Sequence, residues 1–392
     1  MQTSTSLNTM FAAALTLLTG GCTNDWQPAF DETEPEGMFD NVTVADTGDA
    51  LTFARIDREG ERRLLAVTRY HGGIIEAVDL SAASGRPRSD AAELLAERGY
   101  DAVRDLVRGA PDSAMVAVPA SQLVLPLDTH DHHIAAATNY PEHAGEAGVK
   151  KGPFLFAKLV APTGPYAEVQ PHGGLLDYEA EVAWVALEPI AAGVGTGLVG
   201  LVLANDFTDR ETLMRHINAW DVESGDGFTT GKSAPGWLPL GNLLVVPRDH
   251  RRFVRDIELR LYVNGRLRQR SMASAMIWDF DEVVARTFAW RDKRWEHRGE
   301  QVSLLGSSAV IPARTLLLSG TPHGTVFAGL RARHFVGAIG SWLTGGWRRP
   351  AIDSVADAYA ADARAAGAYL QRGDRVEIHV ERLGMLRNTV VD

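Results

Sequence analysis

Residues 177–185, with the sequence DYEAEVAWV, decide how the rest of this 392-residue chain is interpreted. The residues of this stretch alternate as in a strand, which places Asp177, Glu179 and Glu181 on one face and apolar residues on the other. Two neighbouring like charges on a half-buried strand are unfavourable unless a cation neutralises them. The stretch therefore indicates half of a divalent-metal site, with the solvated face of an edge strand as the open alternative.

A third carboxylate follows the next apolar run. Residues 197–204 are almost entirely apolar, a pattern typical of a strand buried on both faces, and the run ends at Asn205 and Asp206. An acid at the end of such a strand points into a cleft or toward a metal, which makes Asp206 a natural partner of Glu179 and Glu181. Three carboxylates suit Mg²⁺, Mn²⁺ or Ca²⁺ and disfavour zinc.

A candidate general base precedes these acids. Pro141 fits the first turn of a short helix, on which His143 and Glu146 lie three residues apart and therefore on one face. A carboxylate orients an imidazole and raises its basicity, which suits a base that acts on water. An ordinary surface pair at this spacing is the alternative.

Composition and charge exclude one class of partner. The chain is 45% hydrophobic with 38 glycines, which fits a globular protein rich in turns and strands, and it is long enough for two domains. The net charge is −11. Residues 1–54 contain eight acidic residues and no Lys or Arg, so the remaining residues carry a net charge of only −3. No basic stripe is present, so nucleic acid is not an expected partner.

The N-terminus resembles an export signal. Residues 10–18 form an apolar segment too short to span a bilayer, and small residues then lead to Cys22, the single cysteine. We expect a lipoprotein-like signal peptide at 1–21, lipidation of Cys22 and an acidic flexible tether over 22–49. The protein would then be anchored in the cell envelope by lipid alone and face the periplasm; a cytoplasmic location is the alternative.

The remaining pattern predicts an α+β protein that is predominantly β. Residues 50–128 are expected to form a small N-terminal α+β domain, with three strands followed by helices at 91–98 and 102–108. Residues 129–392 would form a larger catalytic domain, with a helix at 279–289 and a hairpin turn at Asn264-Gly265. Two segments, at about 290–310 and 327–370, have the character of insertions, and the second includes a helix over 353–369.

Seven short motifs occur in an order that resembles the fumarylacetoacetate hydrolase family. They are Asn-Tyr-x-x-His-x-x-Glu at 139–146, Asp-Tyr-Glu-x-Glu at 177–181, Asn-Asp at 205–206, Gly-Lys-Ser at 231–233, Val-Asn-Gly-x-x-x-Gln at 263–269, Gly-Thr-Pro-x-Gly at 320–324 and Gly-Asp-x-Val-Glu at 373–377. The resemblance covers about 129–326 and 371–392, and more loosely 50–127. Each motif alone is weak, and the ordered set is specific.

The resemblance implies a fold and a set of site residues. The fold would be a mixed β-sandwich roll with peripheral helices, commonly paired as a homodimer. A divalent metal, usually Mg²⁺ and alternatively Mn²⁺ or Ca²⁺, would be held by Glu179, Glu181 and Asp206, and the dyad of His143 and Glu146 would activate water. Substrate contacts would come from Lys232, which is also a catalytic candidate, and from Thr321, Tyr140 and Arg210.

The resemblance also implies a reaction. We expect a divalent-metal-dependent hydrolase that cleaves a C–C bond of an acylpyruvate or β-diketo acid through a stabilised enolate. A 2-oxo acid decarboxylase, isomerase or hydratase of the same family is the alternative, and a non-catalytic envelope-anchored binding protein is the alternative from another class. The chain departs from the family at Thr212-Leu213, where a Gln is frequent, so the specific substrate stays open.

Overall fold

The computed structural model describes residues 30–392 apart from 147–151, 219–220, 328, 331–333 and 335–350. The predicted signal peptide, Cys22 and the first part of the predicted tether lie outside the described residues. Nearly all of residues 334–347, an apolar part of the predicted insertion at about 327–370, also lies outside them. Among the helices that are described, none has the length and apolar character needed to cross a bilayer.

The largest element is a mixed sheet that runs through most of the molecule. Its strand order is β4-β3-β2-β1-β12-β10-β9-β17-β5-β6. Most neighbours are antiparallel, and β17 runs parallel to β5. The strands are β1 (Ala50–Arg58), β2 (Glu61–His71), β3 (Ile74–Asp79), β4 (Met115–Pro119), β5 (His133–Ala137), β6 (Phe154–Lys158), β9 (Ala180–Ala186), β10 (Val199–Asn205), β12 (Leu244–Pro247) and β17 (Leu316–Leu318).

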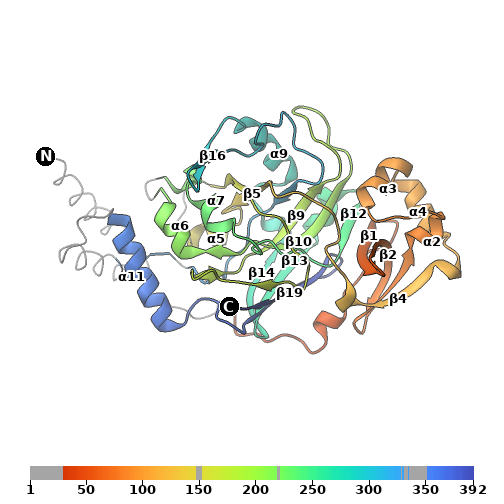
Figure 1. The fold of residues 1–392 in the computed structure, drawn as a ribbon, viewed down its shortest axis with the longest axis horizontal. Helices are drawn as coiled ribbons and strands as arrows, with labels where there is room; N and C mark the ends of the chain where they lie inside the picture. The colour runs from red at the N-terminus through yellow and green to blue at the C-terminus, as the bar shows by residue number, and fades with distance from the viewer. Residues whose placement is uncertain (1–29, 147–151, 219–220, 328, 331–333, 335–350) are drawn as a thin grey trace.

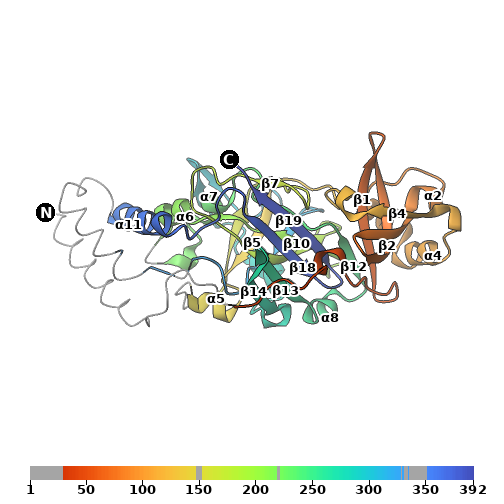
Figure 2. The ribbon, with the colours of Figure 1, turned by 90° about the horizontal axis from the view of Figure 1, so that it is seen from below.

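The N-terminal α+β unit forms one end of the molecule (Figures 1 and 2). Three helices pack on its strands, α2 (Leu80–Ser84), α3 (Ala91–Arg98) and α4 (Tyr100–Arg108). Asp79 and Asp90 cap α2 and α3 by accepting hydrogen bonds from backbone N–H groups of the first turn. Strand β1 pairs with β12, so the sheet of this unit continues directly into the catalytic part of the chain.

A second sheet packs against the first and makes a sandwich. Its order is β14-β13-β18-β19-β7, and apolar side chains of both sheets, such as Trp184 and Leu259, share one core cluster. Asn264 and Gly265 both have positive φ, 52° and 75°, as a two-residue hairpin turn requires. The strands of this second sheet are β7 (Glu168–Val169), β13 (Glu258–Val263), β14 (Arg266–Met272), β18 (Arg375–Val380) and β19 (Gly384–Val390). The predicted α+β, predominantly β fold is confirmed.

Helices α5 (Pro141–Glu146), α6 (Arg210–His216), α7 (Phe228–Lys232) and α11 (Ala351–Ala366) gather toward the end opposite the N-terminal unit, and α9 (Phe280–Ala289) lies nearer the middle, at the top of the view (Figure 1). The predicted helix at 279–289 is confirmed as α9, with Asp279 as its N-cap, and the helix predicted at 353–369 is α11, which packs on α6. The catalytic part also contains α8 (His250–Arg255). Two small ribbons complete the fold: β8 (Leu176–Asp177) with β11 (Thr208–Asp209), and β15 (Trp295–His297) with β16 (Glu300–Val302).

Two expectations need correction. Residues 30–49 belong to the predicted flexible tether, yet they are packed: Phe39 and Val42 are buried and Glu32 pairs with Arg270. Glu34 also lies 3.9 Å from Arg375 of the second sheet, so this part of the segment is not a free linker. The stretch 177–185 is also not one strand, because it is interrupted at Tyr178 and Glu179 between β8 and β9.

Candidate metal centre and active site

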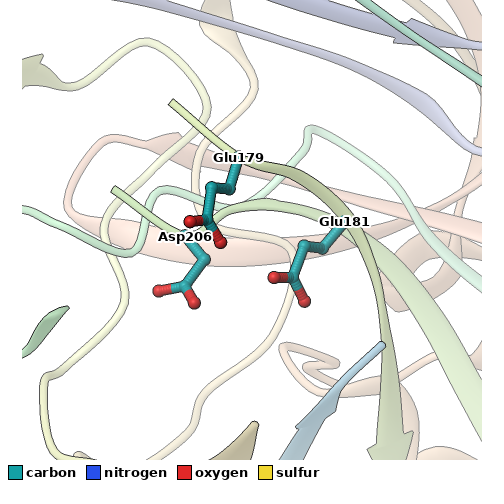
Figure 3. A group of neighbouring side chains, drawn as sticks. All are labelled: Glu179, Glu181 and Asp206. Atoms are coloured by element: carbon teal, nitrogen blue, oxygen red, sulfur yellow. The ribbon is translucent and has the colours of Figure 1, made fainter. Parts of the chain in front are cut away.

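The metal-binding candidates meet where two neighbouring strands begin and end. Strand β9 pairs antiparallel with β10, which sets Ala180 opposite Asn205 and Glu181 opposite Ala204. Glu179 immediately precedes β9 and Asp206 immediately follows β10, and the Asp206 N–H donates a hydrogen bond to the Glu179 carbonyl oxygen at 2.9 Å. The side chains of Glu179, Glu181 and Asp206 consequently turn toward one small region (Figure 3).

The three carboxylates form a tight, buried group. Each of them offers an oxygen that lies within 4.8 Å of the others. Glu179 is 5% exposed, and Glu181 and Asp206 are each 1% exposed. Strand β9 is flanked by β10 and β17, so the alternative of a solvated edge strand is wrong.

Most of the negative charge in this group is balanced by buried cations. Lys232 Nζ lies 2.6 Å from Glu179 Oε2 and 2.9 Å from Asp206 Oδ2. Arg210 bridges Glu179 and Asp177, at 2.7 Å and 2.8 Å. Lys158 Nζ lies 2.5 Å from Asp206 Oδ1, as an ion pair without hydrogen-bond geometry.

Glu181 is the exception. Its Oε2 accepts a hydrogen bond from the Gly320 N–H at 2.7 Å, and no cation among the described residues pairs with it. Four buried carboxylates, counting Asp177, therefore face three buried cations. With all four carboxyl groups ionised, one negative charge of the described cluster is left without a counter-charge, and Glu181 is the carboxylate that has no described cation beside it.

The ionisation of the cluster reflects this imbalance. Burial, together with Asp206 and Glu179, raises the pKa of Glu181 well above its ordinary value. Burial also acts to raise the pKa of Glu179, but Lys232 and Arg210 outweigh it and hold that pKa at about 2. Burial acts to lower the pKa of Lys232, but Asp206 and Glu179 outweigh it, so that pKa is raised and the ammonium stays charged.

A divalent cation fits these residues. Oxygen-only ligands match Mg²⁺, Mn²⁺ or Ca²⁺, and the unbalanced carboxylate of Glu181 supplies the charge that such an ion would neutralise. Lys232 Nζ contacts two of the three ligands, so ammonium and metal would compete for the same carboxylate charge.

The predicted dyad lies beside the cluster. His143 is 6% exposed on α5, and its Nδ1 lies 3.4 Å from Glu146 Oε2. With Nδ1–H donating to this carboxylate, Nε2 is the ring nitrogen that can accept a proton. Glu146 is itself held by the Gly324 N–H, at 3.2 Å from each of its oxygens.

The loop 319–324 presents backbone N–H groups to anions, and these anions are the protein's own carboxylates. Gly320 donates to Glu181 and Gly324 donates to Glu146, so one loop orients both a metal-ligand candidate and the dyad. Gly324 has φ +96°, and a Cβ there would lie 2.0 Å from the Arg268 carbonyl oxygen. This position therefore requires glycine.

A cavity of ≈ 250 Å³ opens beside the cluster. Five of the predicted site residues line it: His143, Glu179, Arg210, Lys232 and Thr321. The other predicted residues are not among its lining. Glu146 supports His143 from behind, and Glu181, Asp206 and Tyr140 are almost fully buried.

Two of the predicted substrate contacts are constrained by existing bonds. The Thr321 hydroxyl donates to the Ala180 carbonyl oxygen at 3.1 Å and accepts from Gln269 Nε2 at 2.9 Å. Tyr140 is completely buried next to Glu181, and burial raises its pKa. Their direct contact with substrate stays a prediction.

Sequence reasoning missed three residues that build the site. Lys158 ends the apolar strand β6, and its placement against Asp206 carries no local signal apart from a lysine in an otherwise apolar run. Gln269 joins β14 to Thr321 and to the Ala180 N–H, and only its place in a motif pointed to it. The role of Asp177 was not predicted: it pairs with Arg210 and accepts hydrogen bonds from the backbone N–H groups of Val326 and Phe327, and it stays outside the carboxylate group that could hold a metal.

Comparisons with known proteins identify the family of the chain. The family model described as "Fumarylacetoacetate (FAA) hydrolase C-terminal" matches residues 132–391. The chain is 24% identical over 306 residues to oxaloacetate tautomerase Fahd2a, mitochondrial, of Rattus norvegicus, covering 75% of this chain and 78% of that protein. It is 27% identical over 207 residues to oxaloacetate tautomerase YisK of Bacillus subtilis, covering 49% and 58% of the two chains.

Solved structures share the fold. A putative HpcE protein from Mycobacterium smegmatis superposes with a TM-score of 0.56 at 20% identity, covering 87% of this chain and 99% of that one. Fumarylacetoacetate hydrolase from Exiguobacterium antarcticum gives a TM-score of 0.53 at 19% identity, with the same coverage. The family match spans well over half of the chain and includes the carboxylates and all seven motifs described above. The chain belongs to the fumarylacetoacetate hydrolase family.

Proposed function

We propose that this protein is a divalent-metal-dependent hydrolase that cleaves the C–C bond of an acylpyruvate-type 2,4-dioxo acid, with Mg²⁺ as its metal. The observation that carries this proposal is the position of His143. It lines the same cavity as Glu179 and Lys232, and Glu146 holds its Nδ1 side. Hydrolysis needs a base beside the carboxylates that would hold the metal, whereas a protein that only binds a ligand does not need such a base.

Each residue has a role that follows from its contacts. Glu179, Glu181 and Asp206 would hold the metal, which supplies electrophilic stabilisation of the negative charge that develops on the substrate oxygens. His143 takes a proton from water at Nε2 as the water oxygen bonds to the C4 carbonyl carbon, and Glu146 stabilises the resulting imidazolium. The C3–C4 bond then breaks and releases the carboxylic acid, and the imidazolium returns the proton to C3 of the pyruvate enolate. Lys232 keeps its charge and donates from Nζ to a developing oxyanion.

The direct test is a product assay. Acetopyruvate is incubated with the purified protein and Mg²⁺, and pyruvate release is followed with lactate dehydrogenase. We expect turnover that is lost with a chelator and is reduced by about 100-fold or more in His143→Asn, since general-base catalysis contributes on this scale.

The matched control is His132→Asn, because His132 binds the Ser303 carbonyl oxygen and lies outside the cavity lining. Its activity should equal that of the wild type. The hydrolase proposal is wrong if acylpyruvates yield no pyruvate, or if His143→Asn retains full hydrolysis.

Tautomerisation of oxaloacetate is a second candidate. Both relatives described above are named oxaloacetate tautomerases, and a base facing a carboxylate cluster also suits proton transfer at a carbon next to a carbonyl. The two candidates separate in one experiment, in which the enol-to-keto conversion of oxaloacetate and pyruvate release from acetopyruvate are measured on the same preparation. A tautomerase shows the first activity without the second.

A further inference from the structure

The cavity beside the carboxylate cluster is lined by two chemically different sets of residues. The polar set belongs to the site described above and includes Arg210 and Lys232. The other set is apolar and makes up most of the wall. The residues that matter for this wall are Leu213, Met214 and Ile217 from α6 and its end, Phe228 from α7, Phe327, and Ile352 from α11.

The cations of the cavity are already used by the protein. Arg210 pairs with Asp177 and Glu179, and Lys232 pairs with Glu179 and Asp206. Among the described lining residues, Arg210 and Lys232 are the only arginine and lysine, and Arg210 also lies over the Phe327 ring, 5.5 Å from its centroid. Both cations are paired with the protein's own carboxylates, so the described lining offers no unpaired arginine or lysine to a second carboxylate of a substrate.

Burial of a carboxylate against such a wall is unfavourable. A carboxylate that leaves water without a cation or hydrogen-bond donors loses its solvation, whereas an alkyl or aryl group gains free energy from the same transfer. Leu213 and Met214 are each 6% exposed and Phe228 is 8% exposed, so these side chains are held in the protein and present a dry surface.

The volume sets the size of the group that fits. An apolar cavity of about 150 Å³ accommodates benzene. The cavity here measures ≈ 250 Å³, which accommodates a 2-oxo acid head near the cluster and a tail of roughly the size of a phenyl ring or a short branched alkyl chain.

We propose that the enzyme selects 2,4-dioxo acids with an uncharged, apolar acyl tail, of butanoyl to benzoyl size, over those that end in a second carboxylate. This inference rests on the proposed function for the reaction at the head group. The inference adds the substrate class, and its evidence is the apolar lining of the cavity rather than the carboxylate cluster.

The test compares two substrates of matched shape. 4-Methylpentanoylpyruvate and succinylpyruvate differ by an isopropyl group in place of a carboxylate. We expect kcat/KM with Mg²⁺ to be at least about 30-fold higher for the first, with a gain of about fourfold per methylene along the series from acetyl to pentanoyl, as about 0.8 kcal/mol per buried methylene gives. Equal or higher kcat/KM for succinylpyruvate would overturn the proposal.

A charge placed in the wall gives the second measurement. Met214→Lys adds a cation to the lining, and His216→Lys adds one to an exposed position of the same helix. We expect Met214→Lys to reduce the preference for the apolar tail by about tenfold or more and His216→Lys to leave it unchanged. The same shift in both variants, or in neither, would contradict the wall's role.

Binding without turnover separates this inference from the proposed function. The stabilisation of the protein by 2-oxo-6-methylheptanoate and by 2-oxoadipate, which differ by an isopropyl group in place of a carboxylate, is measured by thermal unfolding with Mg²⁺. Stronger stabilisation by the branched acid, with no hydrolysis of any acylpyruvate, would reject the hydrolase proposal and support the apolar wall. Stronger stabilisation by the diacid would overturn the inference whether or not hydrolysis occurs.

Discussion

Two buried glutamates in this molecule differ in whether a cation balances their charge. Glu377, on β18 of the second sheet, is 0% exposed and lies between Arg375 and Arg387, at 2.7 Å and 2.5 Å. Glu181, on β9 of the first sheet, is 1% exposed and has a single backbone donor and no described cation. The first carboxylate is satisfied by the fold, and the second is left for something that the chain does not supply.

This difference separates a structural role from a functional one. A buried charge is tolerated when partners balance it, and an unbalanced one is costly unless a ligand compensates for it. Both glutamates are equally buried, so burial alone does not distinguish them. The balance of charges within a few ångströms does distinguish them. Four variants or conditions can test whether this balance separates a structural glutamate from a functional one.

The largest effect is expected from Glu181→Gln. Gln keeps an acceptor for the Gly320 N–H but removes the unbalanced charge. Metal-dependent turnover should fall by about a thousandfold, since electrophilic stabilisation supplies several kcal/mol. The free energy of unfolding without metal should not decrease, which chemical denaturation checks. A large loss of stability would mean that Glu181 is structural after all.

The opposite result is expected from Glu377→Leu. Arg375 and Arg387 lose their common partner, so the free energy of unfolding should fall. Because their side chains are 46% and 40% exposed and can be hydrated, we expect the decrease to be limited to about 2–3 kcal/mol. kcat with Mg²⁺ should stay within about twofold of the wild type below the unfolding range. Loss of activity at unchanged stability would reverse the comparison.

Mg²⁺ should affect one glutamate and not the other. At 100 times its Kd, Mg²⁺ should stabilise the wild type by about 2.7 kcal/mol. The same addition should stabilise Glu377→Leu by a similar amount and leave Glu181→Gln nearly unchanged, as followed by thermal unfolding. If the Mg²⁺-induced stabilisation were equal in all three proteins, the ion would bind elsewhere.

The smallest effect concerns the competition between Lys232 and the metal. Lys232→Met removes a charge that neutralises Glu179 and Asp206, so the Kd for Mg²⁺ should fall by about tenfold while turnover also falls. Calorimetric titration measures the affinity. Lys293→Met is the control, because Lys293 lies over Trp290 at 4.2 Å and contacts none of these carboxylates. Weaker Mg²⁺ binding in Lys232→Met would show that the ammonium supports the metal.

The sequence anticipated much of the fold and most of the polar residues of the site. Alternation and turn signals are local, so they located the N-terminal strands, the turn at Asn264-Gly265 and the helix that begins after Asp279. Motifs identified Glu179, Glu181, Asp206 and the pair His143 and Glu146, which the structure brings together. The interruption at Tyr178 was missed, because alternation continues across a break in a strand.

The sequence by itself determined which side chains could bind a metal and act as a base, because these depend on residue type and short spacing. Only the tertiary structure decided that Lys158, 48 residues away from Asp206 in the chain, balances its charge while Glu181 stays unbalanced. It also decided that Leu213, Phe228 and Ile352 share one wall of the cavity. Charge balance and cavity shape are sums over contacts between distant segments, and no local pattern encodes them.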